Sequence, residues 1–153
     1  FTKFNERCFL RLLGDMRSVN YVVDITPDFE EVQYRVRTID FDQQCHEGDI
    51  RVYRAHAFPD NFPVDELVRT QLNVKTIQQY RAEERSQMAR RAMVERPRLA
   101  AILSTMRRDT LAPEENVARL REDLRKRYDT AAFDSCRTMG DLTATHIHHL
   151  LGS

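Results

Sequence analysis

The sequence predicts an α+β fold in which a β-hairpin packs on a mainly helical bundle. Two short segments rich in β-branched and aromatic residues, 21–25 and 32–39, flank a turn and have the character of paired strands. Over residues 64–151, apolar side chains recur mostly at helical spacing. The 153 residues suffice for one domain with its own core, and no repeat or low-complexity tract divides them. We therefore expect a single domain over residues 1–153.

The first expected element is a helix at the beginning of the chain. Phe4, Cys8, Phe9 and Leu12 recur at the spacing that places side chains on one helical face. This helix would lead directly into the loop that follows it. Cys8 lies on the apolar face, so we expect it to be packed and not to act as a nucleophile.

The expected hairpin comes next. Residues 21–25 form the first strand, the Thr-Pro-Asp sequence at 26–28 is a turn signal, and residues 32–39 begin with the alternation of a half-buried strand. Asn20 stands at the entrance of the first strand and Asp40 at the exit of the second. Because antiparallel pairing brings these two ends together, we expect Asn20 and Asp40 to lie close enough to share one metal ion. A surface hairpin with ordinary polar ends is the alternative.

The chain after the hairpin is expected to be helical, apart from an irregular segment at 43–63. The start and stop signals are Asn73, Pro97, Pro113 and the Thr138-x-x-Asp141 pattern. The main expected helices cover residues 64–72 and 75–94, with further helices after Pro97, Pro113 and Thr138. Charges on 75–94 alternate in sign, which is typical of a solvated, salt-bridged face. A wall that faces a substrate or a partner is the alternative.

Residues with catalytic character lie on both sides of the hairpin. The stretch Leu-Gly-Asp-Met-Arg-Ser-Val-Asn at 13–20 places Asp15 five residues before Asn20, and Asp40 lies in Ile-Asp-Phe-Asp at 39–42. Phosphoryl transfer needs three such groups. One carboxylate orients the attacking hydroxyl and takes its proton, while an amide oxygen and a second carboxylate hold Mg²⁺ against the nucleotide phosphates. Asp15, Asn20 and Asp40 are therefore candidates for these three groups.

Over residues 4–44 the chain resembles the C-terminal lobe of the protein-kinase-like superfamily, nearest the branch of aminoglycoside and small-molecule phosphotransferases. In that branch the loop commonly reads His-Gly-Asp-x-x-x-x-Asn, and the later strand ends in Ile-Asp-Phe or Ile-Asp-Trp. The matching positions are Gly14, Asp15, Asn20 and residues 39–41. Two positions depart from the pattern, because Leu13 stands in place of the His and Asp42 stands where protein kinases have Gly.

The resemblance implies ATP and Mg²⁺ as cofactors and a hydroxyl-bearing acceptor as substrate. Asp15 would be the catalytic base or orienting carboxylate, and Asn20 and Asp40 would bind the metal and, through it, the nucleotide. Arg17 occupies the position of a phosphate-contacting Lys in many protein kinases, so it is either a second catalytic residue or a solvated loop Arg. Asp42 is expected to be a turn residue rather than a second acidic group near the metal.

The parts of a kinase that hold the nucleotide phosphates have no counterpart in this sequence. With only four Gly, the chain has no Gly-rich phosphate loop, and no strand Lys precedes Asp15. Both features belong to the N-terminal lobe of a kinase. We therefore expect the chain to be the second lobe of a larger protein, with the N-terminal lobe as its partner and with poor ATP binding by itself. The alternatives are a catalytically inactive pseudokinase-like lobe and a helical protein-interaction domain.

Composition argues against several other classes of protein. Lys plus Arg and Asp plus Glu both number 24, so there is no global attraction to nucleic acid or anionic membranes. No apolar run approaches the ~20 residues that a membrane span requires. Three scattered Cys argue against a disulfide framework, and the His-rich tract at 146–149 matches no zinc spacing. We expect a cytoplasmic protein with no nucleic-acid or membrane partner.

Overall fold

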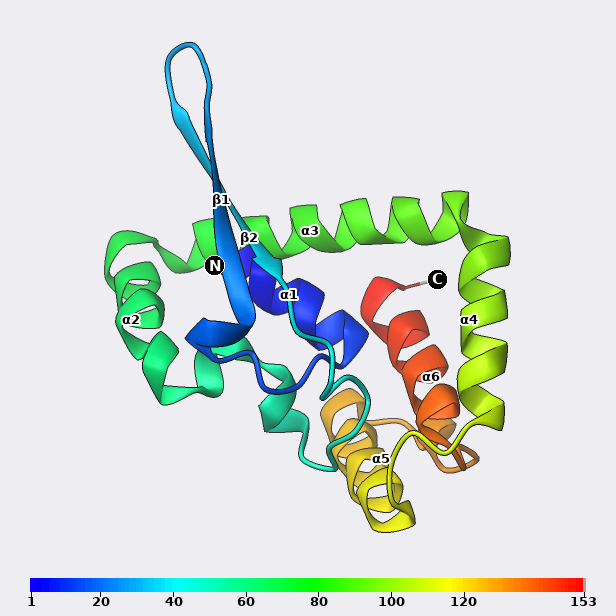
Figure 1. The fold of residues 1–153 in the computed structure, drawn as a ribbon. Coiled ribbons are helices and arrows are strands. Elements are labelled where there is room, and N and C mark those ends of the chain that lie inside the picture. Colours follow the sequence, from blue (N-terminus) through cyan, green and yellow to red (C-terminus); the bar gives the residue numbers. More distant parts are fainter. Residues whose placement is uncertain (153) are drawn as a thin grey trace.

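The computed structural model describes residues 1–152. Within them lie six α-helices and one antiparallel hairpin of two strands, which confirms the α+β class (Figure 1). β1 spans Tyr21–Pro27 and β2 spans Val32–Thr38. The helices are α1 (Thr2–Arg11), α2 (Phe62–Gln71), α3 (Val74–Val94), α4 (Arg96–Arg108), α5 (Glu114–Tyr128) and α6 (Met139–Leu151). None of these helices is both long enough and apolar enough to cross a membrane.

The helices form an angular frame, not a bundle of parallel rods (Figure 1). α3 and α4 run along two sides of the frame and meet at a sharp corner at Glu95, with Pro97 in the first turn of α4. α6 lies inside the corner, in contact with α1, α3, α4 and α5. α4 approaches α6 closely at Gly140, where a Cβ atom would lie 2.6 Å from the carbonyl carbon of Met106. A glycine is therefore needed where these two helices cross.

Two clusters of buried side chains form the interior. The larger one joins α1, α5 and α6, and it includes Phe9, Leu12, Leu120, Leu124, Phe133 and Leu142. The smaller one lies under the base of the hairpin and consists of Phe4, Cys8, Leu13, Met16 and Ala55. Cys8 is fully buried, as its place on the apolar stripe predicts. Since α1 contributes to both clusters, it connects the hairpin side of the molecule to the helical side.

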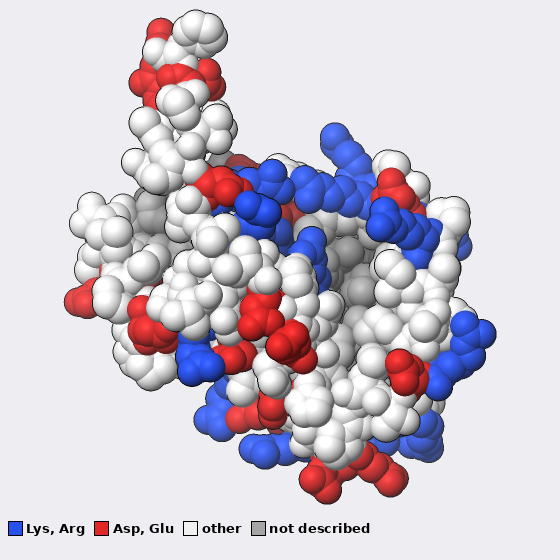
Figure 2. All heavy atoms as spheres, viewed as in Figure 1, with Lys and Arg blue, Asp and Glu red and all other residues white. Residues whose placement is uncertain are grey.

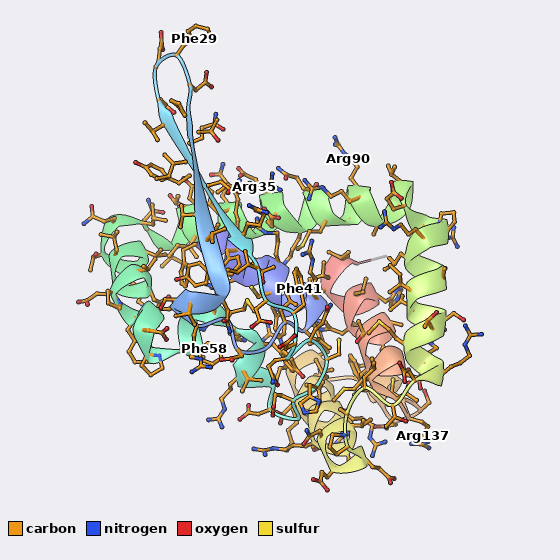
Figure 3. All side chains as sticks on the ribbon, viewed as in Figure 1. Phe29, Arg35, Phe41, Phe58, Arg90 and Arg137 are labelled. Atoms are coloured by element: carbon orange, nitrogen blue, oxygen red, sulfur yellow. The ribbon has the colours of Figure 1, made fainter. Side chains whose placement is uncertain are left out.

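Only the base of the hairpin packs on the helices. Tyr21 and Val36 contact the smaller cluster, whereas Ile25 and Tyr34, further out on the same face, are 63% and 70% exposed. The outer half projects from the body (Figure 1), and Phe29 at its tip is fully exposed (Figure 3). The predicted packing of the hairpin therefore holds for its base alone. Its apolar alternation continues unchanged into the uncovered half, so the sequence pattern does not mark the boundary.

Charged residues of α3 contact α1 as well as solvent. Glu6 of α1 pairs with Arg81 at 3.4 Å and with Arg85 at 2.8 Å. Arg7 pairs with Glu84 at 3.1 Å, and the Glu84 side chain is almost fully buried. The charged face of α3 is thus partly an interface between helices. The prediction of a solvated, salt-bridged face therefore holds for only part of α3.

Most helix boundaries follow the predicted signals. The Asn73 side chain accepts a hydrogen bond from the third backbone N–H of its helix at 2.9 Å, as expected of an N-cap. Thr138 and Asp141 form the expected reciprocal capping box. Two details differ, because α2 begins at Phe62, two residues early, and Pro113 has extended backbone angles and caps α5 from outside its first turn.

Candidate functional site

The loop after α1 is fixed by backbone contacts to the segment that follows the hairpin. The Cys45 N–H donates to the Leu12 carbonyl at 2.9 Å, and the Gly14 N–H donates to the Gln43 carbonyl at 3.3 Å. A Cβ atom on Gly14 would lie 2.9 Å from that same carbonyl oxygen. The glycine that precedes Asp15 is therefore required by the close approach of two backbones.

Asn20 joins this loop to the hairpin. Its Nδ2 donates to the backbone carbonyl of Asp15 at 2.6 Å. Its own carbonyl accepts a hydrogen bond from the Ile39 N–H at 3.0 Å, one residue beyond the strand pairing of Tyr21 with Thr38. Asp40 follows directly after Ile39. The expected proximity of the hairpin entrance and exit is therefore confirmed at the level of the backbone.

Asn20 and Asp40 each retain a side-chain oxygen that accepts no hydrogen bond within residues 1–152. Asn20 uses its Nδ2 on Asp15, which leaves Oδ1 free. Asp40 Oδ1 accepts from the Asp42 N–H at 3.0 Å, which leaves Oδ2 free. This contact places Asp42 in a tight turn, the role expected for it.

A magnesium ion bound by these two oxygens would have to take its remaining ligands from water and phosphate, as Mg²⁺ commonly does in nucleotide sites. Within residues 1–152, no group of three or more His, Cys, Asp or Glu side chains is arranged to hold a metal. The roles predicted for Asn20 and Asp40 therefore depend on a bound nucleotide.

Both oxygens of the Asp15 carboxylate accept hydrogen bonds from the Arg17 guanidinium. Arg17 Nε lies 2.6 Å from Oδ1, and Nη2 lies 2.9 Å from Oδ2. The hydrogen bond to Asp15, followed by the charge of that carboxylate, raises the pKa of the Arg17 guanidinium. Arg17 was expected either to contact phosphate or to be solvated, and in the structure it is the ion-pair partner of Asp15. The Arg17 side chain is more than half exposed, so the pair lies at the surface, where such pairs contribute little stability and can open.

Asp15 has a left-handed backbone with φ of 53° and borders an open pocket of about 280 Å³. Gln43, Glu47, Val52 and Phe58 line the rest of this pocket, and Figure 3 labels Phe58 below the base of the hairpin. Asn20 and Asp40 do not line it. The structure thus links the predicted site residues through backbone contacts without surrounding one cavity with all three side chains.

Asp60 and Asn61, which the sequence did not single out, hold the loop at 13–20 through side-chain hydrogen bonds. Asn61 is fully buried and donates to the carbonyls of Met16 and Ala55, each at 2.7 Å. Its Oδ1 accepts from the Tyr21 hydroxyl at 2.6 Å. Asp60 accepts from the backbone N–H and the hydroxyl of Ser18, which lowers the pKa of its carboxyl group.

No local signal distinguishes Asp60 and Asn61 from other turn residues, because their partners in the loop and in β1 lie about forty positions earlier in the chain. They hold the segment between Asp15 and Asn20 in place, so they position the predicted site without belonging to it.

Comparison of the chain with protein-family models, with curated proteins and with solved structures finds no match. The resemblance to kinase-like lobes therefore depends on the motif residues and on the geometry described above.

Proposed function

We propose that this chain is the C-terminal catalytic lobe of an ATP- and Mg²⁺-dependent phosphotransferase that acts on a hydroxyl-bearing acceptor. The observation that supports it best is the 2.6 Å hydrogen bond from Asn20 Nδ2 to the Asp15 carbonyl. Beside it, the Ile39–Asn20 backbone hydrogen bond places Asp40 at the same end of the hairpin. One loop and one hairpin base thereby carry the three groups that phosphoryl transfer requires.

In this proposal Asp15 orients the acceptor hydroxyl and takes its proton. Its carboxylate must first exchange Arg17 for the hydroxyl, and the exposure of Arg17 permits this exchange. The released guanidinium can then donate two hydrogen bonds to a phosphate oxygen pair. Mg²⁺, bound through oxygens of Asn20 and Asp40, would offset the negative charge of the nucleotide phosphates.

Exposed apolar side chains around the motif support the proposal of a second lobe. Val19, Ile39 and Phe41 flank the predicted metal ligands and are 71%, 53% and 50% exposed. Apolar surface of this kind, gathered in one region, is typical of an interaction site. We propose that an N-terminal lobe covers these residues and supplies the contacts to adenine and to the outer phosphates. The 153-residue chain alone should therefore bind ATP poorly and lack turnover.

The metal role is tested by Asp40→Asn in the chain combined with the proposed N-terminal lobe. Loss of the carboxylate should lower Mg²⁺-dependent ATP turnover by more than about 100-fold, because the metal then holds the phosphates less well. Asp42→Asn changes a neighbouring carboxylate in the same turn and should leave turnover near the wild-type value. Equal turnover in the two variants would contradict the proposal.

The role of Asp15 is tested separately from binding. Asp15→Ala should lower turnover while Mg-ATP affinity, measured by calorimetry, stays within a few-fold of wild type, because Asp15 faces the acceptor. A parallel loss of nucleotide affinity would instead place Asp15 among the nucleotide ligands.

A second candidate function is protein interaction by a pseudokinase-like lobe. The bidentate Asp15–Arg17 pair favours it, because both carboxylate oxygens are occupied when no substrate is present. The projecting apolar half of the hairpin offers a contact surface. Mg-ATP calorimetry on the folded two-lobed protein distinguishes the candidates, since complete absence of binding supports the interaction function.

A further inference from the structure

An arginine-rich pocket of about 340 Å³ lies beside the base of the hairpin, bordered by α1, β2 and α3. No Asp or Glu lines it. The arginines that line it are Arg7, Arg11, Arg35, Arg37 and Arg91. Figure 2 shows positive side chains gathered beside the hairpin base and along α3, and Figure 3 labels Arg35 at this position. We refer to these five residues and the space between them as the arginine pocket.

The arginine pocket carries more positive charge than its surroundings neutralise. Arg7 pairs with Glu84, and Arg37 pairs with Asp24 at 3.1 Å. The guanidinium groups of the other three arginines have no ion pair or hydrogen bond within residues 1–152. The chain as a whole has zero net charge, so the excess is a local feature of this pocket.

The cations of the pocket also act on one another. The pKa of Arg11 is lowered, first because its guanidinium is partly desolvated and then because of the positive charge of Arg7, with a further contribution from Arg91. An anion bound between them would remove this repulsion. Arginine presents a planar fork of donors that matches phosphate oxygens.

The outer edge of β2 adds backbone groups to the same pocket. Arg7 Nη2 donates to the Val36 carbonyl at 2.8 Å. Hydrogen-bonded and non-hydrogen-bonded pairs alternate along an antiparallel ladder. Since Asn20 and Ile39 are a hydrogen-bonded pair, Val36, which pairs with Val23, belongs to a non-hydrogen-bonded pair. Its backbone N–H and C=O therefore point away from β1 and toward the pocket. The Val36 N–H is therefore a further donor at the pocket wall.

The arginine pocket adjoins an apolar groove of about 660 Å³ inside the corner of α3, α4 and α6. The two share Arg11, Phe41 and Arg91 as lining residues, and Figure 3 labels Phe41 in front of α1 near α6. The groove has the volume of a small-molecule site. Its apolar lining includes Met88, Leu99, Ile102, Leu103, Ile147 and Leu151.

We propose that the arginine pocket and the apolar groove together bind one amphiphile, with a phosphate-bearing head among the arginines and an apolar chain along the groove. A phosphate monoester carries nearly two negative charges at neutral pH, which would offset much of the positive charge of the three unpaired arginines. The apolar chain would be removed from water along the walls of the groove. Neither the pocket nor the groove shares a lining residue with the pocket beside Asp15, so the inference does not use the proposed catalytic pocket. Phe41 lines both the pocket and the groove and is also one of the residues that the proposed N-terminal lobe would cover.

The first test uses dodecyl phosphate, titrated into the chain below the concentration at which it forms micelles. Inorganic phosphate provides the head alone, and dodecyl maltoside provides the same chain with an uncharged head. Dodecyl phosphate should bind at least tenfold more tightly than either. Equal affinity for inorganic phosphate would exclude the groove, and equal affinity for the maltoside would exclude recognition of the head, so either result overturns the proposal.

Matched variants locate the two halves of the site. The double variant Arg11→Gln, Arg91→Gln should weaken dodecyl phosphate binding at least tenfold. Arg90→Gln, whose side chain points away from the body in Figure 3, should leave binding unchanged. Ile102→Glu should weaken dodecyl phosphate binding but leave inorganic phosphate binding unchanged, and Ala100→Glu serves as its control on the exposed side of α4.

Each variant is compared with wild type by circular dichroism and thermal unfolding, so that loss of folding is recognised. Because Ile102, Ala100, Arg11 and Arg91 are exposed, these substitutions should leave the fold intact. Wild-type affinity for dodecyl phosphate in the double arginine variant would overturn the proposal. So would an acidic amphipathic peptide that displaces dodecyl phosphate and binds more tightly, since the surface would then belong to a protein partner.

Discussion

The loop at 13–20 and the outer half of the hairpin follow one another in sequence, yet they are stabilised in opposite ways. The loop is held by backbone hydrogen bonds to residues 43–45 and by the side chain of the buried Asn61. The outer hairpin has its own strand ladder, while its apolar side chains face solvent. The chain therefore fixes the predicted catalytic groups by itself, whereas the hairpin surface would need another molecule to cover it.

The largest effect should come from the buried amide that holds the loop. Asn61→Ala leaves the Met16 and Ala55 carbonyls buried without their donor and removes the acceptor of the Tyr21 hydroxyl. We expect a loss of about 3–4 kcal/mol in unfolding free energy, measured by urea denaturation. Asn73→Ala removes an exposed helix cap and should cost about 1 kcal/mol. Similar losses of unfolding free energy in both variants would mean that Asn61 does not hold the loop.

A pH dependence should arise from the helical core, remote from the hairpin. His146 is buried, its Nε2–H donates to the Phe9 carbonyl at 2.8 Å, and its Nδ1 accepts from the Tyr128 hydroxyl at 3.0 Å. Its pKa is lowered from the usual 6.5 to about 4, first by burial and then by the nearby Arg127 and Arg54, against the raising effect of the Phe9 hydrogen bond.

The unfolded chain therefore binds a proton near pH 6.5 that the folded chain does not. The stability is fully present above pH 6.5 and decreases as the pH falls toward 4, by about 3 kcal/mol from this residue. His146→Gln should flatten the dependence of unfolding free energy on pH between 6.5 and 4. An unchanged slope would show that another group causes the acid sensitivity.

Gly14 should show an intermediate effect. A Cβ atom at this position would lie 2.9 Å from the Gln43 carbonyl oxygen, and backbone cannot rotate away as a side chain can. Gly14→Ala should therefore destabilise the fold by about 2 kcal/mol, measured by urea denaturation. An unchanged free energy of unfolding would show that the two backbones can move apart. The backbone contact would then not be what holds Asp15 in place.

The smallest effect is expected on the outer hairpin. Tyr34→Thr keeps a strand-forming residue where the side chain is mostly exposed, so it should change the unfolding free energy by less than about 0.5 kcal/mol. Val36→Ala, on the same face but packed on the smaller cluster, should cost about 1 kcal/mol. A large loss for Tyr34→Thr would indicate that the outer half is covered within this chain.

The features that the sequence predicts correctly depend on local patterns. β-branched residues and a turn signal predicted the hairpin, and the backbone contact between its two ends, from Ile39 to Asn20, followed from antiparallel pairing. Helix caps such as Asn73 and Thr138 were recognised because their partners lie three residues away.

The features that it missed depend on distant partners. Asn61 acts on Met16 and Tyr21, and Glu6 pairs with arginines of α3, so no window of sequence contains both members of either contact. The Asp15–Arg17 pair is local, but the sequence-based alternatives for Arg17 were a phosphate contact or a solvated side chain, and neither of them is this ion pair.

The exposed turn at the hairpin tip has a consequence for limited proteolysis. Phe29 extends fully into solvent at the end of a projecting element, which is the geometry that a chymotrypsin-like protease accepts. Cleavage there would leave α1, the loop and β1 on one fragment, and β2 with the remaining helices on the other. Strand pairing, the α1–α3 ion pairs and the shared core would keep the two fragments together. The nicked protein should therefore migrate as one species under native conditions and separate into two only on denaturation.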